Sequence, residues 1–151
     1  MSARRLVHLG LGAGLLLGLA ACQKPSPGVT VVTNGHSVHV AASNYCFHGE
    51  TLASEDQCPA DGPTKTTVKV RPGDNVGIDV DSELADTGWV VYDPVSRQNS
   101  DIHRSHYFSF TATFGATETG AFLEIHQIKA GQGPTDLNKV LGIWRFELVS
   151  S

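Results

Sequence analysis

The chain has 151 residues, which is enough for one hydrophobic core and too few for two domains of ordinary size. Of its 11 Lys and Arg, Arg4 and Arg5 precede Cys22, whereas all 15 Asp and Glu follow it, so the part after Cys22 carries a formal charge of −6 with His neutral. That sign argues against a nucleic-acid partner, which needs a cationic face, and against electrostatic adhesion to anionic lipid.

Residues 1–21 have the two-part layout of a secretory signal peptide. Met1–Arg5 is cationic, and Leu6–Leu19 is apolar without an acidic residue. This apolar run of about 14 residues is shorter than the roughly 20 that cross a bilayer, so we expect it to be cleaved. It ends in Leu19-Ala20-Ala21-Cys22, which resembles the lipobox of bacterial lipoproteins. The resemblance implies that acyl chains such as palmitate are attached through Cys22. An ordinary secreted protein is the alternative.

Residues 22–28 form the expected lipidated N-terminus and tether. The stretch Gln23–Gly28 contains two prolines and no apolar run, which is typical of a short, stiff linker. The folded domain is therefore expected over residues 29–151.

The cysteine count agrees with export. The chain has three cysteines, and lipidation of Cys22 leaves Cys46 and Cys58 free to pair. A disulfide between them closes a loop of about a dozen residues and contributes roughly 3 kcal/mol by the chain-entropy estimate. The alternative is a metal pair, although the spacing is unlike Cys-x-x-Cys and no second pair exists.

Alternating apolar and polar residues predict a series of short strands after residue 28. The clearest pair is Val29–Thr33 and His36–Ala42, which the turn dipeptide Asn34-Gly35 joins as a hairpin. Further strands are predicted within residues 64–71, 76–81, 89–92, 106–112, 121–129 and 140–149, with one helical turn within 82–88. About seven or eight strands without a long helix predict an all-β protein, an antiparallel β-sandwich of immunoglobulin-like or cupredoxin-like type.

Candidate functional side chains are few. Asp101, His103 and His106 flank a predicted loop-to-strand junction and offer three ligands to zinc or copper, the alternative being a polar loop with solvated imidazoles. Trp89 and Trp144 are expected in the core rather than in a ligand groove. The sequence has no nucleophile elbow, phosphate-cradling loop or His-Glu-x-x-His run, so we predict neither an enzyme nor a resident cofactor.

Six short motifs follow one another along the chain. They are Ala21-Cys22-Gln23-Lys24-Pro25, Tyr45-Cys46-Phe47, Val70-Arg71-Pro72-Gly73-Asp74, Gly88-Trp89, His106-Tyr107-Phe108 and Trp144-Arg145-Phe146-Glu147-Leu148. In this order they resemble a family of small bacterial lipoproteins known through a domain of unknown function. The resemblance implies a lipid-anchored extracytoplasmic β domain and brings no activity with it. The chain is also weakly similar to cupredoxins, but it lacks the residues of a blue-copper site.

These observations favour a non-enzymatic binding module on the extracytoplasmic face of the cell membrane. Its partners are expected to be the membrane, through the lipid on Cys22, and an envelope protein or other envelope component that contacts its loops. The alternative is an envelope protein that binds copper or zinc through Asp101, His103 and His106. A hydrolase ranks last.

Overall fold

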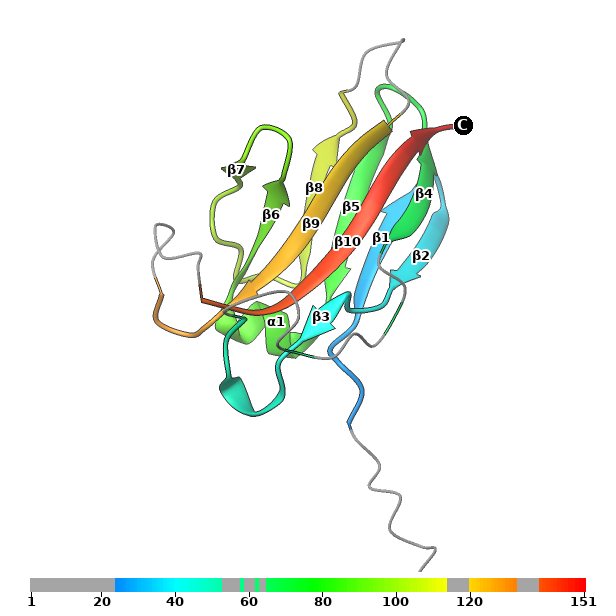
Figure 1. Ribbon diagram of the computed structural model, residues 1–151. Coiled ribbons are helices and arrows are strands. Elements are labelled where there is room, and N and C mark those ends of the chain that lie inside the picture. Colours follow the sequence, from blue (N-terminus) through cyan, green and yellow to red (C-terminus); the bar gives the residue numbers. More distant parts are fainter. Residues whose placement is uncertain (1–23, 53–57, 59–61, 63–64, 114–119, 133–138) are drawn as a thin grey trace, which may run out of the picture.

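Two β-sheets face each other across one hydrophobic core (Figure 1). The computed structural model describes residues 24–52, 58, 62, 65–113, 120–132 and 139–151. The first sheet has the order β2 (His36–Val40), β1 (Val29–Thr33), β5 (Asn75–Val80) and β8 (Tyr107–Thr111). The second has the order β3 (Asn44–Tyr45), β10 (Val140–Ser150), β9 (Gly120–Ile128), β6 (Trp89–Asp93) and β7 (Gln98–Asn99), with β4 (Thr66–Val70) also beside β10. The predicted all-β sandwich is confirmed.

The first hairpin forms as the sequence predicts. Asn34 and Gly35 have φ values of 45° and 78°, the positive values that a two-residue hairpin turn of this kind requires. Thr33 pairs with His36 across the turn, and β1 continues into antiparallel pairing with β5 on its other side. The turn dipeptide therefore sets the register of this edge of the first sheet.

Side chains of both sheets alternate between the core and the outer faces. On β10, Trp144 and Phe146 are fully buried. On β5, Ile78 is fully buried, whereas the next residue, Asp79, is exposed on the outer face. Trp89 of β6 is also fully buried, and its indole N–H donates to the carbonyl oxygen of Ser105 at 3.0 Å. Both tryptophans thus belong to the core, as expected.

One strand pairing differs from the antiparallel prediction. β4 runs parallel to β10, with Thr66 opposite Phe146 and Val70 opposite Ser150. Alternation identified β4 as a strand, but it carries no information on the partner or its direction. The two-residue strands β3 and β7 were also not predicted, because a strand of that length is too short to show a period.

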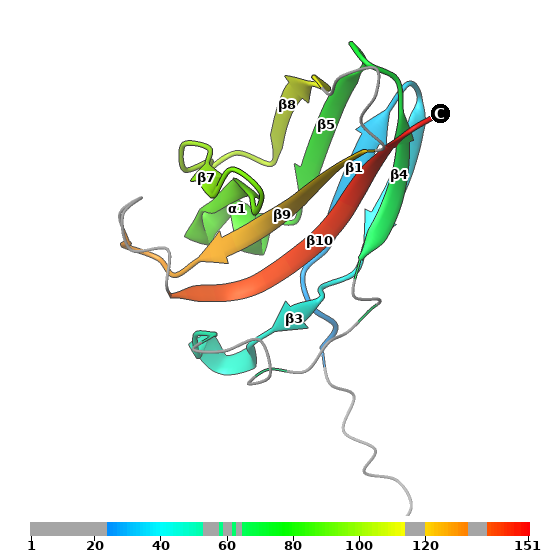
Figure 2. The same cartoon turned by 45° about the horizontal axis from the view of Figure 1, so that its top comes forward.

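Cys46 and Cys58 are joined by a disulfide, as predicted, with their Cα atoms 5.1 Å apart. They form a second small cluster with Leu52, Val140 and Ile143. Ile143 and Trp144 are neighbours on β10, so their side chains lie on opposite faces of the second sheet. The cluster is therefore separate from the main core and covers part of the outer face, where β3 and the 3-10 helix η1 (Phe47–Gly49) lie beside β10 (Figure 2).

The outer face of the second sheet also carries a buried ion pair. Glu124 is only 8% exposed, although it lies on the side of β9 opposite Leu123 and Ile125. Arg145 donates from Nε to Glu124 Oε1 at 2.8 Å, and His126 Nε2 lies 2.6 Å from the other carboxylate oxygen. The simple in-and-out alternation of this strand therefore fails at Glu124, because Arg145 and His126 contact its carboxylate on the outer face, where Arg145 also donates to Asn44 Oδ1.

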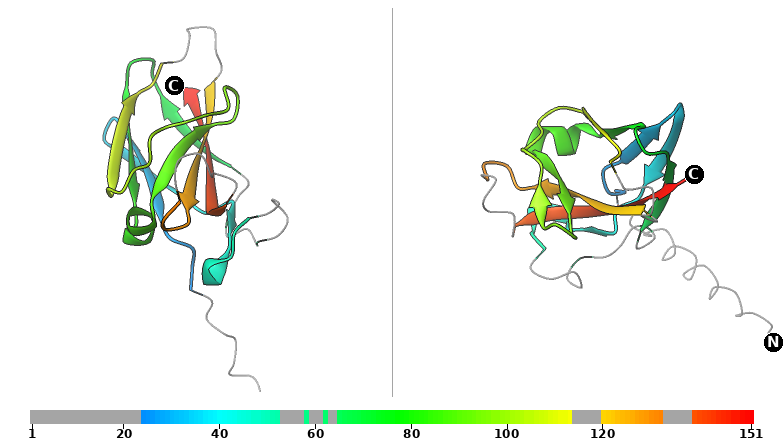
Figure 3. Two further views of the ribbon diagram at one scale, coloured as in Figure 1. Left: turned by 90° about the vertical axis from the view of Figure 1, so that its left-hand side faces the viewer. Right: turned by 90° about the horizontal axis from the view of Figure 1, so that it is seen from above.

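The start of β1, the short helix α1 (Ser82–Thr87) and η1 gather at one end of the sandwich (Figures 1 and 3). The C-terminus lies at the other end. α1 ends at Gly88, whose φ of 104° suits glycine and whose backbone N–H donates to the carbonyl oxygen of Leu84. This end of the molecule brings together three segments that are far apart in the sequence.

Candidate functional site

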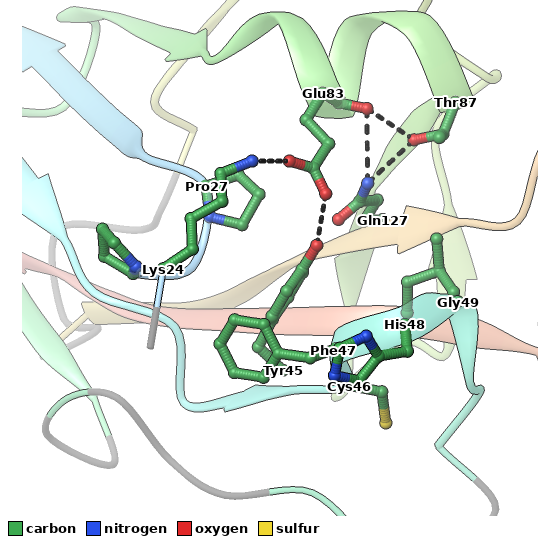
Figure 4. A pocket seen from close by; sticks show the side chains of 12 residues that line it. Lys24, Pro27, Tyr45, Cys46, Phe47, His48, Gly49, Glu83, Thr87 and Gln127 are labelled. Atoms are coloured by element: carbon green, nitrogen blue, oxygen red, sulfur yellow. Dashed lines mark hydrogen bonds and ion pairs between the residues drawn. The ribbon is translucent and has the colours of Figure 1, made fainter. Parts of the chain in front are cut away.

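A pocket of about 880 Å³ opens at the end where these three segments meet (Figure 4). Its wall contains Lys24 and Pro27 from the segment before β1, Tyr45 to Gly49 from β3 and η1, Glu83 and Thr87 from α1, and Gln127 from β9. The volume lies in the range of about 300–1,000 Å³ that is typical of small-molecule sites. We call it the anchor-end pocket, because the segment that leads to Cys22, the predicted lipidation site, forms part of it.

The segment before β1 lies against the domain. The backbone N–H of Gly28 donates to Asp81 Oδ2 at 2.6 Å, and Pro27 is buried. Lys24 Nζ lies 3.0 Å from Glu83 Oε2. Of the predicted tether, the part that the structure describes, residues 24–28, is therefore in contact with the domain rather than extended away from it.

Tyr45 and Glu83 form a hydrogen-bonded pair in the pocket wall. The Tyr45 hydroxyl donates to Glu83 Oε1 at 2.5 Å, and Tyr45 is only 5% exposed. The hydrogen bond from Tyr45 and then the Lys24 ammonium hold the pKa of Glu83 below its ordinary value, against the opposing effect of burial. Burial, and then the hydrogen bond and charge of Glu83, raise the pKa of Tyr45. At neutral pH the carboxylate is therefore ionised and the phenol protonated.

Gln127 contributes a polar group with unused hydrogen-bonding capacity. Its side chain is fully buried, and its Nε2 donates to Thr87 Oγ1 at 2.9 Å and to the Glu83 carbonyl oxygen at 3.3 Å. A carbonyl oxygen only accepts, so this contact fixes which end of the amide is the nitrogen. Gln127 Oε1 is left without a hydrogen-bond partner among the described residues, on the side of the amide turned toward Tyr45 (Figure 4). Leaving a buried acceptor unsatisfied costs about 1–3 kcal/mol.

A glycine on β10 makes room for the aromatic part of the wall. Gly142 pairs with Tyr45 on one side and with Gln127 on the other. A Cβ atom at position 142 would lie 2.6 Å from Cδ2 of Tyr45, so a side chain there would displace the ring. The Tyr45 ring in turn meets Phe47 edge to face, with ring centroids 4.8 Å apart.

The structure does not gather the three predicted metal ligands into a site. His103 is stacked on Phe108 with ring centroids 4.0 Å apart, and its Nε2 lies 3.1 Å from Ser100 Oγ. His106 Nδ1 lies 3.0 Å from the carbonyl oxygen of Val80, while Asp101 is exposed. Within the described ranges, no group of three or more His, Cys, Asp or Glu side chains is placed to hold a metal ion. The metal-binding alternative draws no support from these residues.

No pattern in the sequence predicted the anchor-end pocket, although Lys24 and Tyr45 occur in the motifs that carry the family resemblance. One signal was present: Gln127 occupies the inward position of β9 that continues Leu123 and Ile125, so a polar residue interrupts an apolar row. Such a residue needs a partner, which makes it a candidate for a functional or structural role. Cys22, the predicted lipidation site, lies outside the described residues.

The fold and the pocket define a small two-sheet, all-β domain with a partly polar, partly aromatic pocket at one end. The chain belongs to the family described as "Protein of unknown function (DUF2771)", whose model matches residues 22–127. The predicted resemblance to a family with a domain of unknown function is thereby confirmed. The match begins at Cys22 and ends at Gln127. No curated protein and no solved structure matches the chain. In the part of the chain that the structure describes, no helix has the length and apolar character needed to cross a membrane.

Proposed function

We propose that this protein is a non-enzymatic binding module, held on the extracytoplasmic face of the cell membrane by lipid on Cys22, and that the anchor-end pocket is its binding surface. The apolar leader and the Leu19-Ala20-Ala21-Cys22 sequence support the anchor. The part of the chain after Cys22 is negatively charged, so anionic lipid does not attract it. A covalent lipid on Cys22 would provide the attachment instead.

The observation that carries the proposal is the position of Lys24. Lys24 is part of the pocket wall and follows Cys22 by two residues. Two residues span at most about 7 Å when fully extended. A lipid on Cys22 would therefore hold the pocket close to the membrane surface, where envelope components are concentrated.

The chemistry of the wall favours binding over catalysis. Both oxygens of Glu83 are engaged, one by Tyr45 and the other by Lys24. The same contacts lower the pKa of Glu83, which makes its carboxylate a weak base. The groups of the wall therefore offer hydrogen bonds and apolar contact, which are the properties of a recognition surface.

The anchor is tested with Cys22→Ser, and Gln23→Ala is a matched control at the next position. Cells that express each variant are fed an alkyne fatty acid and then separated into membrane and soluble fractions. We expect the wild type and Gln23→Ala to carry the label and to sediment with membranes, whereas Cys22→Ser carries no label and is largely released. Labelling of Cys22→Ser, or a soluble and unlabelled wild type, would contradict the proposal.

The binding surface is tested by photo-crosslinking in cells. The photoreactive residue p-benzoylphenylalanine replaces His48, an exposed residue of the pocket wall, or Ser109, an exposed residue on β8. We expect adducts with an envelope component from position 48 that are absent from position 109. Equal yields from the two positions, or no adduct from position 48, would show that the pocket is not the binding surface.

A further inference from the structure

We infer that the anchor-end pocket binds an uncharged sugar ring, carried as the headgroup of an envelope glycolipid. This inference rests on the proposed function and names the chemistry of the ligand for the same pocket. Three properties of the wall lead to it: an unused hydrogen-bond acceptor, a compensated pair of charges, and exposed ring surface.

The unused acceptor calls for a ligand that donates hydrogen bonds. Gln127 Oε1 is buried and has no partner among the described residues, while the Nε2 end of the same amide is held by Thr87 and the Glu83 carbonyl. A 180° rotation of the Gln127 amide would place its oxygen against the carbonyl oxygen of Glu83, where two acceptors would face each other. A ligand hydroxyl that enters the pocket and donates to Oε1 satisfies the group without disturbing its other contacts.

The charges of the wall favour a neutral ligand. Among the described residues, Glu83 is the one acidic residue that lines the pocket, and its carboxylate already accepts from the Tyr45 hydroxyl and from Lys24 Nζ. An anionic ligand would have to draw Lys24 away from Glu83, and a cationic ligand would have to replace it. A hydroxyl-bearing ligand needs neither change, and it can share hydrogen bonds with the exposed imidazole of His48.

The remaining wall is suited to the C–H groups of a sugar. Phe47 is partly exposed in the pocket and contacts Tyr45 edge to face, and the ring of Pro27 faces the same space (Figure 4). The face of an aromatic ring is electron-rich, so it accepts weakly positive C–H groups. A sugar presents hydroxyls at its rim and C–H groups on its faces, which matches a wall of one amide oxygen beside aromatic and aliphatic rings.

The location of the pocket selects a membrane-bound source for the sugar. Lys24 forms part of the wall, and Cys22, the proposed point of lipid attachment, is two residues away. A glycolipid headgroup lies in the same plane as the anchor and so is present at high local concentration. A free sugar has the same chemistry and is distinguished in the experiment.

The test uses the full chain as cells mature it, reconstituted in phosphatidylcholine nanodiscs and labelled with ¹⁵N-glutamine. The side-chain amide resonance of Gln127 is followed by NMR in three arms: titration with methyl β-D-glucopyranoside, nanodiscs that contain digalactosyldiacylglycerol, and nanodiscs that contain phosphatidylserine. We expect the glycolipid to shift this resonance and phosphatidylserine to leave it unchanged. A shift with the free sugar as well shows that the headgroup alone suffices.

A pair of phenylalanine variants locates the contact. Phe47→Ala should weaken glycolipid binding roughly tenfold, whereas Phe110→Ala, which removes an equally large and partly buried ring from β8, should change it by less than about twofold. A Gln127 resonance that responds to neither sugar source, or that responds to phosphatidylserine instead, overturns the inference. If fatty-acid labelling and adducts from position 48 persist in that case, the proposed function stands and the ligand class alone is wrong.

Discussion

Removal of the disulfide should lower the stability of the domain by an amount that follows from its loop length. Cys46 and Cys58 are 12 positions apart, and closing a loop of that size removes enough freedom from the unfolded chain to stabilise the fold by about 3 kcal/mol. The double variant Cys46→Ala, Cys58→Ala should lose this amount. It should lose slightly more through packing, because both sulfur atoms belong to the buried cluster with Leu52, Val140 and Ile143.

The assay is urea unfolding of three proteins: the oxidised wild type, the wild type in reductant, and the double variant. The reduced wild type keeps the sulfur volume, so its difference from the oxidised form isolates the effect of the covalent link. A loss of about 3 kcal/mol corresponds to a fall of about 10 °C in Tm for a domain of this size. A reduced wild type within about 1 kcal/mol of the oxidised form would refute the loop-entropy reasoning.

Hydrogen exchange adds a local measurement to the same experiment. The backbone N–H of Leu52 donates to the carbonyl oxygen of Val140, and both residues belong to the buried cluster that contains the disulfide. Its exchange should accelerate by more than the global loss of stability explains, whereas the amide of Trp144 in the main core should follow the global change only. Equal acceleration at both positions would mean that the disulfide stabilises the whole fold without any local role.

Three further predictions concern the sheet, the buried ion pair and a histidine. Gly142→Ala should displace the Tyr45 ring and destabilise the fold by about 1–3 kcal/mol, measured by urea unfolding, because the new Cβ would lie 2.6 Å from that ring; a neutral result would contradict the close approach. Glu124→Ala should cost about 3–5 kcal/mol, because it leaves the Arg145 guanidinium buried without its carboxylate, and a loss below about 1 kcal/mol would mean that the pair is solvated. Burial lowers the pKa of His103 in the folded protein, against the opposing charge of Asp101. The unfolded chain therefore binds a proton at His103 more readily than the folded protein does. The stability that His103 contributes is complete above about pH 6.5, the ordinary pKa of histidine, and is lost as the pH falls below that value. The free energy of unfolding should therefore decrease between pH 7.5 and 5.5 more steeply in the wild type than in His103→Gln, and identical slopes would contradict the assignment.

The local structure of this domain was largely predictable from its sequence, because it depends on neighbouring residues. Asn34-Gly35 predicted the first hairpin, since few dipeptides accept positive φ at both positions. The alternation within residues 140–149 predicted β10, on which Trp144, Phe146 and Leu148 face inward, since side chains on a strand alternate. Each of these inferences needed only a short stretch of the chain.

The pairing of distant strands was not predictable in the same way. The paired residues of the parallel neighbours β4 and β10 lie 80 positions apart, and either strand would show the same alternation beside another partner. The burial of Glu124 accompanies its contact with Arg145 of β10, which no pattern within β9 records. Long-range contacts therefore account for these two differences between the predicted and the observed fold.

The pocket was hidden for the same reason. Lys24, Tyr45, Glu83 and Gln127 come from four separate segments, and only the closed sandwich brings them to one end. By contrast, Asp101, His103 and His106 are close in sequence and suggested a metal site, yet each side chain has other surroundings in the structure. Proximity along the chain was a poor guide to the site, and an inward polar residue in an apolar row was the better signal.

The central claim is that Cys22 holds this domain, and with it the anchor-end pocket, at the membrane surface. Mass spectrometry of the N-terminal peptide, taken from protein extracted from membranes, tests that claim most directly. The account predicts a mature chain that begins at Cys22 and carries the added mass of a diacylglycerol group. A chain that still begins at Met1, or one that starts at an unmodified residue, would contradict it.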